Sequence, residues 1–149
     1  MPSQNPLPTI GWRERVDFPD WGLRRVRAKI DTGARTSAID VAQIEDLPDG
    51  RIRFEVVFRT TPSRKTQWVE ATPVRTSMVK PSHGTTQERH VCRTRVRVGG
   101  IEREIEISLV CRAGMLCRML LGRTALAGAV VVDPEKKYLL TRKAAAKPK

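Results

Sequence analysis

Two adjacent glycines, Gly99 and Gly100, interrupt a long alternating stretch and constrain the fold more than any other feature of this sequence. A two-residue Gly-Gly loop is typical of the primed turns that join antiparallel strands. Counting outward from the loop opposes three arginines to three glutamates: Arg93 and Glu106, Arg95 and Glu104, Arg97 and Glu102. Each such cross-strand pair adds about 0.2–1 kcal/mol. We therefore expect these glutamates to be structural partners on a solvated face, and not metal ligands.

Short strands are predicted through the rest of the chain as well. Residues 51–59 alternate and then become apolar, and residues 26–31 alternate with Val26, Ala28 and Ile30 on one face. Residues 118–128 have the pattern of a short buried strand, a glycine and one or two turns of helix, and a strand at 129–133 follows. The sequence thus predicts an all-β fold with one short C-terminal helix. Arg103 interrupts the apolar face of the Gly-Gly hairpin without an evident reason.

The length of 149 residues suits one domain with one core. We expect a flexible tail over residues 1–9, a folded domain over 10–141 and a basic, disordered tail over 142–149. No apolar run is long enough to cross a bilayer, and the first residues lack the apolar stretch of a signal peptide. Three cysteines, an odd number without a C-x-x-C pair, favour reduced thiols over a disulfide scaffold. These features predict a cytoplasmic protein.

The excess of positive charge indicates the kind of partner. There are 28 Lys and Arg residues against 16 Asp and Glu residues, a net charge of +12. Such a field attracts polyanions, including nucleic acid, ribosomes and acidic peptides. Aromatic residues make up only 5% of the chain, and no aromatic-rich RNA-binding motif is present. Nucleic acid is therefore a less favoured partner than an acidic peptide or protein.

Two separated motifs carry the strongest chemical signal. The first is IDTGARTSA, in which an alternating strand ends at Asp31 and is followed by Thr32 and Gly33. Gly33 permits backbone geometry and a close approach that a side chain would prevent. The second is MLLGR at residues 119–123, about ninety residues later. An early D-T-G-A followed by two apolar residues and G-R resembles the paired signature of retropepsins, in which the second strand crosses beneath the aspartate loop.

Longer segments make the resemblance more specific. The chain resembles a bacterial and archaeal family labelled ATP-dependent zinc proteases, whose members accompany RimK-type ATP-grasp ligases. The resemblance runs from Ile10 to Leu140. The segments that carry it are IGWRERV, PDWGL, AKIDTGARTSAI, HGTTQER, RVRVGGIEREIEISL, RMLLGRTAL and DPEKKYLL.

The resemblance implies a retropepsin-like acid protease barrel and an aspartic-type endopeptidase. Peptide hydrolysis by this route requires two carboxyl groups facing one water, yet the chain contains a single D-T-G. We therefore expect a twofold homodimer in which Asp31 of each copy supplies half of the dyad. Thr32 would brace the two loops and Gly33 would offer backbone groups to the substrate. The resemblance assigns structural support of the site to Leu121, Gly122 and Arg123.

The substrate groove is predicted from the same resemblance. Retroviral enzymes carry an acidic residue after D-T-G-A, whereas Arg35 follows Ala34 in this chain. Both residues are expected to face the substrate, and Arg35 would pair with a carboxylate. Together with RimK-type ligases, which add glutamates to a ribosomal protein, this suggests glutamate-rich peptide tails as substrates. A flap over residues 78–91 is expected to close the groove, with its tip at Ser82, His83 and Gly84.

Two other interpretations remain open from the sequence. A non-catalytic module could dock a RimK-type ligase, a ribosome or RNA, and a metal-dependent protease would match the family's label. The sequence gives the label little support, because H-E-x-x-H is absent and the two histidines, His83 and His90, lie in a polar segment. No phosphate-binding G-x-x-x-x-G-K-[ST] loop is present either. We accordingly expect no metal and no cofactor.

Overall fold

Strands dominate the described part of the chain. A computed structural model describes residues 6–79, 87–110 and 117–141. The strands are β1 (Thr9–Gly11), β2 (Arg13–Phe18), β3 (Leu23–Asp31), β4 (Ser37–Asp46), β5 (Ile52–Arg59), β6 (Lys65–Ala71), β7 (Arg75–Val79), β8 (Gln87–Val98), β9 (Ile101–Val110), β10 (Met119–Gly122) and β11 (Val131–Asp133). A 3₁₀ turn, η1 (Pro48–Gly50), and one short helix, α1 (Arg123–Leu126), complete the elements. The prediction of an all-β fold with one short C-terminal helix is confirmed.

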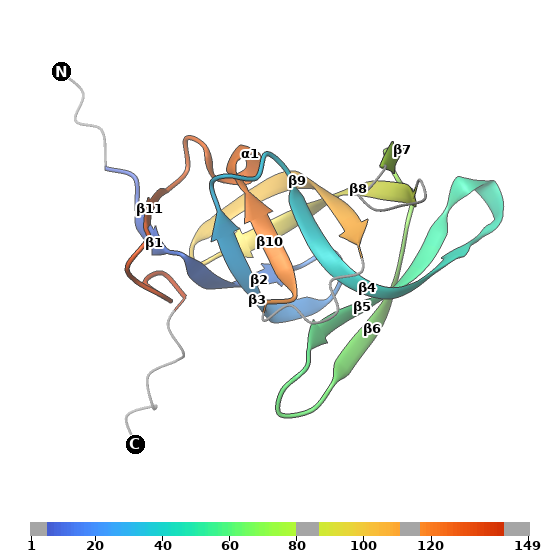
Figure 1. Cartoon of the computed structure of the whole chain (residues 1–149), viewed down its shortest axis with the longest axis horizontal. Helices are drawn as coiled ribbons and strands as arrows, with labels where there is room; N and C mark the ends of the chain where they lie inside the picture. The colour runs from blue at the N-terminus through green and yellow to red at the C-terminus, as the bar shows by residue number, and fades with distance from the viewer. Residues whose placement is uncertain (1–5, 80–86, 111–116, 142–149) are drawn as a thin grey trace.

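Six strands close into a barrel from which an arm extends (Figure 1). The order around the barrel is β10, β3, β2, β8, β9 and β4, and β4 pairs back with β10. Beyond the barrel, β4 continues into antiparallel pairing with β5, and β5 pairs with β6, so that these strands form the arm. Strand β7 pairs with the first half of β8, and β1 pairs with β11 in a separate parallel ribbon.

The Gly-Gly hairpin has the predicted register. Val98 lies opposite Ile101, and each of the three arginines lies opposite its expected glutamate. The ionic contacts differ in one respect, because the guanidinium of Arg95 binds Asp20, which lies between β2 and β3, and Glu102 rather than Glu104. Gly99 has a φ of 60°, and a Cβ there would lie 2.5 Å from Cγ of Leu140. Glycine is thus required at position 99 for two reasons: its φ is positive, and the side chain of Leu140 occupies the space that a Cβ would need.

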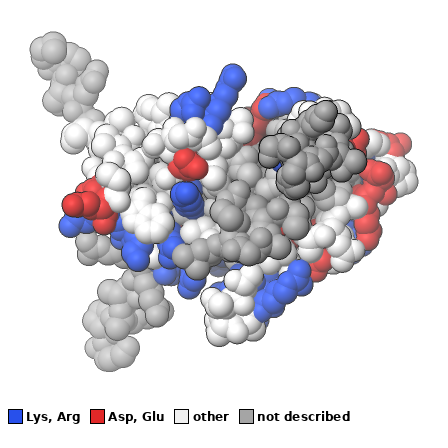
Figure 2. Space-filling view, viewed as in Figure 1, with Lys and Arg blue, Asp and Glu red and all other residues white. Residues whose placement is uncertain are grey.

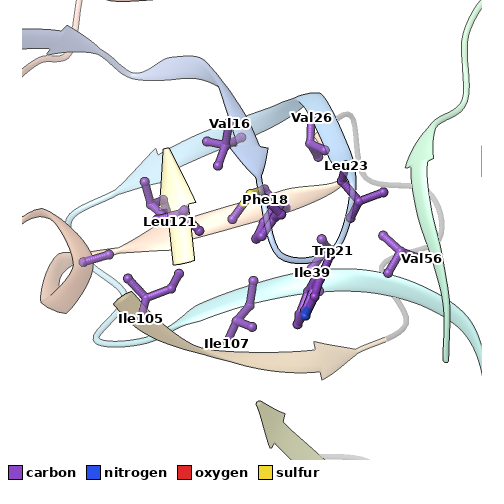
Figure 3. Close-up of a cluster of buried hydrophobic side chains, with 14 of the residues drawn as sticks. Val16, Phe18, Trp21, Leu23, Val26, Ile39, Val56, Ile105, Ile107 and Leu121 are labelled. Atoms are coloured by element: carbon purple, nitrogen blue, oxygen red, sulfur yellow. The ribbon is translucent and has the colours of Figure 1, made fainter. Parts of the chain in front are cut away.

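The core fills the barrel and continues beneath the arm. Figure 3 shows buried side chains from β2, β3, β4, β5, β9 and β10 gathered in one cluster with Phe18 and Trp21. The rings of Phe18 and Trp21 stack with centroids 5.3 Å apart, and Phe54 meets Trp21 edge-on at the same distance. Cys92 is fully buried, and this burial raises the pKa of its thiol to about 11. Such a thiol acts as a small apolar core group.

Arg103 has a structural role that the sequence did not reveal. Its Nη1 donates hydrogen bonds to the carbonyl oxygens of Ala125 (3.2 Å) and Ala127 (2.7 Å). These carbonyls lie at the C-terminal end of α1, where backbone acceptors lack partners within the helix. Arg103 therefore satisfies the end of the helix and fixes α1 against β9.

A buried carboxylate fastens the last described residues to the barrel. Glu14 is fully buried and accepts hydrogen bonds from the backbone amides of Gly11, Leu139, Leu140 and Thr141 and from the Thr141 hydroxyl. Hydrogen bonds to an ionised carboxylate are stronger than neutral ones, and together they offset the cost of burying the charge. The segment before β2 and the segment after β11 therefore meet at one side chain.

The tails are only partly described. Thr9, expected at the end of the N-terminal tail, pairs with Val131 in the β1–β11 ribbon. Residues 142–149, predicted to be a basic tail, lie outside the described residues. No helix among the described residues is long and apolar enough to span a membrane.

Candidate active site

Asp31 ends strand β3 and begins an exposed loop. Its side chain is half-buried, and its Oδ1 accepts a hydrogen bond of 3.0 Å from the backbone amide of Gly33. A Cβ at Gly33 would lie 3.3 Å from that oxygen, so glycine is what allows the backbone to approach the carboxylate closely. The amide of Ala34 donates to the Asp31 carbonyl oxygen at 3.2 Å and closes the turn. The D-T-G segment therefore forms a tight loop around one carboxylate.

Strand β10 passes directly beneath this loop, as the paired motifs predicted. It pairs in parallel with β3, with Leu121 opposite Ile30 and Gly122 opposite Asp31. On its other side it pairs antiparallel with β4. Leu121 is buried at 2% exposure, which anchors the strand in the core. The end of β10 is thereby fixed beside the end of β3.

Gly122 is the closest point of contact between the two motifs. A Cβ at this position would lie 2.5 Å from the carbonyl oxygen of Thr36, well inside van der Waals contact. The Gly122 amide also donates a 3.0 Å hydrogen bond to Oγ of Ser37, a buried side chain. A side chain at Gly122 would therefore push the aspartate loop away from its support.

The first residues of α1 hold the loop through its backbone. The amide of Arg123 donates to the carbonyl oxygen of Ala34 at 2.8 Å, and the Arg123 Nη1 donates to that of Gly33 at 3.2 Å. Both the amide and the hydroxyl of Thr124 donate to the carbonyl oxygen of Arg35, at 3.2 and 2.8 Å. The loop is thus shaped from below by hydrogen bonds within the same chain.

The outer side of the loop is open to solvent. Thr32 and Arg35 are exposed, and Ala34 is half-buried between them. Arg35 lines a shallow pocket of about 420 Å³ together with Arg75, Glu106 and Thr124. Within that pocket Glu106 binds Arg75, whereas no carboxylate of the described residues pairs with Arg35. The surface beside the Asp31 loop therefore offers a guanidinium without an ion pair among the described residues, although the carboxylate of Glu104 also lines this pocket.

The arms of the predicted flap are present as the β7–β8 hairpin. Met78 lies opposite Glu88 in antiparallel register, and Met78 is 64% exposed. His90 contacts Thr76 and Glu88 on these arms. The expected flap tip at Ser82, His83 and Gly84 lies outside the described residues.

Three supporting residues were missed at the sequence level. Ser37 and Thr124 hold the loop, and Arg118 forms a buried ion pair of 2.7 Å with Asp40, joining β4 to the approach of β10. Arg118 begins the segment predicted to contain a buried strand, and a charged side chain there was the available signal, whereas Ser37 and Thr124 carried no such signal. Among the described residues, no group of three or more His, Cys, Asp or Glu side chains is placed to hold a metal ion.

Comparisons with known proteins find similarity in sequence over nearly the whole length of this chain. Residues 9–143 match the RimB-like family, described as the retropepsin-like aspartic endopeptidase RimB. A "Probable alpha-L-glutamate ligase" of Shewanella pealeana is 32% identical over 138 residues, which is 90% of this chain and 30% of that protein. A protein of the same name from Desulfotalea psychrophila is 32% identical over 128 residues, covering 84% of this chain and 28% of that protein. The chain thus spans about a third of the length of these curated relatives.

A solved structure agrees in fold. The crystal structure of a Legionella pneumophila protein of unknown function has a TM-score of 0.70 and 25% identity, covering 90% of this chain and 98% of that one. The barrel, the D-T-G loop and the β10 strand beneath it are the features expected of retropepsins. On these grounds the chain belongs to the RimB-like family of retropepsin-like aspartic endopeptidases.

Proposed function

We propose that this protein is an aspartic-type peptidase that acts as a homodimer, with Asp31 of each copy forming a catalytic dyad. The observation that carries this proposal is the Asp31 loop itself, held from within by β10 and α1 while its outer side is exposed. A surface that is shaped by its own chain and left open on one side suits contact with a second copy. Twofold symmetry would bring the two Asp31 side chains to one axis.

The reaction divides the work between the two carboxyl groups. One ionised carboxylate accepts a proton from the attacking water, and the other carboxyl, which is protonated, donates to the carbonyl oxygen of the peptide bond. The resulting tetrahedral diol collapses when the leaving nitrogen takes a proton and the C–N bond breaks. Two carboxylates a few ångströms apart share one proton because both cannot ionise easily. A lone Asp31 cannot perform both tasks, so catalysis requires the second copy.

Acidic peptides are the substrates that we propose. Arg35 follows the loop directly, is exposed, and forms no ion pair with a carboxylate of the described residues. A guanidinium in this position can bind a substrate carboxylate through two parallel hydrogen bonds. The names of the ligase relatives support the same choice, since a glutamate ligase makes glutamate-bearing products.

Replacing the aspartate tests catalysis. We expect Asp31→Asn to lower kcat by at least about a hundredfold, because the amide cannot accept the proton of water. Asp49→Asn is the matched control, since Asp49 is exposed and its φ of 67° is tolerated by asparagine. Undiminished cleavage by Asp31→Asn would refute the proposal. The homodimer would be refuted if the protein is strictly monomeric in solution and its specific activity does not change on dilution.

Peptides of different charge test the substrate class. We expect Arg35→Gln to lower kcat/KM about tenfold on a glutamate-rich peptide and to leave a neutral peptide of equal length unaffected. Arg64→Gln, at an exposed position between β5 and β6, removes the same charge elsewhere and serves as control. Equal rates on both peptides for the wild-type protein would remove the acidic-substrate proposal.

A docking module is the second candidate. The observation in its favour is that the ligase relatives contain the matched segment as about a third of a longer chain. If the protein is such a module, the wild-type and Asp31→Asn proteins would bind a RimK-type ligase with the same affinity, and neither would cleave peptides. Activity that disappears with a chelator and returns with zinc would instead indicate the metal-dependent protease.

A further inference from the structure

The outer face of β2 and β3 gathers positive charge in an unusual register. We call Arg13, Arg15, Arg25, Arg27 and Lys29 the basic face. Arg15 lies directly opposite Arg27, and Arg13 lies directly opposite Lys29. The residues between them, such as Val16 and Val26, point into the core and are fully buried. Like charges directly opposite each other in a sheet are destabilising. The basic face therefore lowers the stability of the hairpin that carries it.

Among the described residues, no carboxylate forms an ion pair with the basic face, although the buried carboxylate of Glu14 acts on Arg15. All 16 Asp and Glu residues of the sequence lie within the described residues. No ion pair joins any of them to a side chain of the basic face there. Glu14, between Arg13 and Arg15 on β2, points into the core and binds backbone amides, and Asp17, on the outer face of β2, accepts a hydrogen bond from the backbone amide of Arg25 at 2.8 Å. Burial lowers the pKa of Arg15, and the charges of Arg25 and Arg27 act in the same direction, whereas Tyr138 and Glu14 act to raise it.

The basic face continues into a pocket. Arg15, Arg25 and Arg27 line a space of about 140 Å³ together with Arg59, at the end of β5, and Arg118. Arg118 is 6% exposed, and although its Nη1 binds Asp40, its buried Nε has no hydrogen-bond acceptor within the described part of the chain. A buried N–H donor without a partner is costly. An anionic group in this pocket would meet several guanidinium groups and lie beside an unused donor.

The basic face and the aspartate belong to the same strand. Arg27, Lys29 and Asp31 occupy alternate positions of β3 on the side opposite to the buried Ile30, and Arg25, whose φ is 58°, precedes them where the strand departs from extended geometry. Alternate residues of a strand are about 6.6–6.8 Å apart, and an extended peptide repeats with the same period. Carboxylates at every second residue of an extended acidic chain would therefore match the cations of β3. Figure 2 shows red atoms along the edge of the arm, whereas blue atoms lie at the top of the view and along its lower left, next to further red atoms near the termini.

The aromatic residues beside the basic face favour a peptide over a nucleic acid. The guanidinium of Arg15 lies 4.0 Å from the ring centre of Tyr138, and that of Arg13 lies 4.8 Å from the ring centre of Trp12. Single-stranded nucleic acids gain much of their affinity by stacking bases on aromatic rings. Here both rings already stack against arginines. Arginine forks remain well suited to carboxylates, which they bind in a bidentate way.

We infer that the basic face is a second binding surface, apart from the dyad, for the acidic segment of a protein substrate. This inference rests on the proposed peptidase function for its substrate class, whereas the binding itself requires no catalysis. The acidic segment lies along β3 and places one carboxylate in the arginine pocket. Binding relieves the repulsion between Arg15 and Arg27.

The test measures binding without cleavage. Asp31→Asn protein is titrated against a fluorescein-labelled oligoglutamate peptide, and Kd is read from fluorescence anisotropy at about 0.1 M salt. Adding Arg27→Gln and Lys29→Gln is expected to weaken binding about tenfold. The matched control adds Arg93→Gln and Arg97→Gln, which removes two charges from a face where both arginines are paired with glutamates. We expect the control to change Kd less than about twofold.

Each outcome decides the inference. An equal loss in both double variants would overturn it, because net charge alone would then explain binding. A polyuridine RNA that binds more tightly than oligoglutamate, and loses affinity in the Arg27→Gln, Lys29→Gln variant, would overturn it in favour of a nucleic-acid surface. Cleavage of a neutral peptide separates this inference from the proposed function. Asp31→Asn protein loses that cleavage if the dyad is correct, whereas its binding of oligoglutamate, measured in the titration, does not depend on the dyad.

Discussion

Two neighbouring hairpins of one barrel use arginine in opposite ways. On the outer face of β8 and β9, Arg97 lies 2.8 Å from Glu102 and Arg93 lies 3.1 Å from Glu106. On the outer face of β2 and β3, arginine and lysine face each other without such partners. The hairpins are joined, since Asp17 of β2 pairs with Arg97 of β8. The two arrangements of charge therefore occur on adjacent strands of the same sheet.

The difference separates charges that serve stability from charges that serve binding. Cross-strand pairs of opposite sign stabilise a sheet, and pairs of the same sign destabilise it by similar amounts. The outer face of β2 and β3 lacks pairs of opposite sign, whereas the adjacent face of β8 and β9 has them. A requirement other than stability therefore accounts for the charges of β2 and β3. The prediction that follows is that stability depends on the charges of β8 and β9, and ligand binding on those of β2 and β3.

The largest effect is expected at Arg118, a buried and ion-paired cation that lines the arginine pocket. Asp40→Asn removes the partner of buried Arg118, and we expect a loss of about 3–5 kcal/mol in the free energy of unfolding, because a buried charge is left uncompensated. Urea unfolding measures this change. Glu88→Gln, at an exposed carboxylate, is the control. A loss below about 1 kcal/mol would mean that water stabilises the charge of Arg118 once the Asp40 carboxylate is removed.

The second-largest effect is expected on stability at low pH. The hydrogen bond from Arg95 lowers the pKa of Asp20, that from Arg97 lowers the pKa of Glu102, and those from Arg75 and Arg93 lower the pKa of Glu106. Since these folded-state values lie below the unfolded ones, the carboxylates contribute stability above about pH 5, and this contribution is lost as the pH falls through about 4 and below. We expect Glu102→Gln, Glu106→Gln protein to lose less stability than wild type between pH 7 and 3. Identical pH profiles by urea unfolding would contradict the stabilising role of these pairs.

The smallest effect is expected from a substitution that gives the β2–β3 hairpin an opposite-charge pair like those of the β8–β9 hairpin. Arg27→Glu places a carboxylate opposite Arg15, and we expect a gain of about 0.5 kcal/mol in stability because attraction replaces repulsion. The same variant should bind oligoglutamate more weakly than Arg27→Gln. Arg64→Glu reverses an exposed charge outside both hairpins and controls for net charge. A variant that is both less stable than wild type and unchanged in binding would eliminate the contrast between the hairpins.

The parts of the site that local rules determine could be predicted from the sequence. The Gly99-Gly100 turn determines the hairpin register by counting. The crossing of β10 beneath the aspartate loop was predicted by the resemblance to retropepsins, and in the structure Gly122 lies opposite Asp31. The salt bridge between Arg95 and Asp20 joins residues 75 positions apart and depends on how β2 meets β8. No periodicity encodes such a contact.

The basic face shows the same limit. Alternation in residues 26–31 placed Arg27 and Lys29 opposite the core face, but the cations that oppose them on β2 follow only from the register of β2 against β3. A bulge between Val16 and Phe18 shifts that register, so counting from the intervening turn would have given wrong partners. Glu14 was also missed, although its inward position among Val16 and Phe18 marked it as a polar residue in a buried place.

The Glu14 carboxylate has a consequence for the connectivity of the chain. It binds the backbone of Gly11 and of Thr141 at once, so these two positions lie within a few ångströms of each other. A short linker between them would close the polypeptide into a ring, and the exposed residues 60–64 between β5 and β6 offer a place to open it again. The order of strands along the gene could thus be rotated while every pairing in the barrel is kept. The fold depends on which strands are neighbours in space and not on where translation starts.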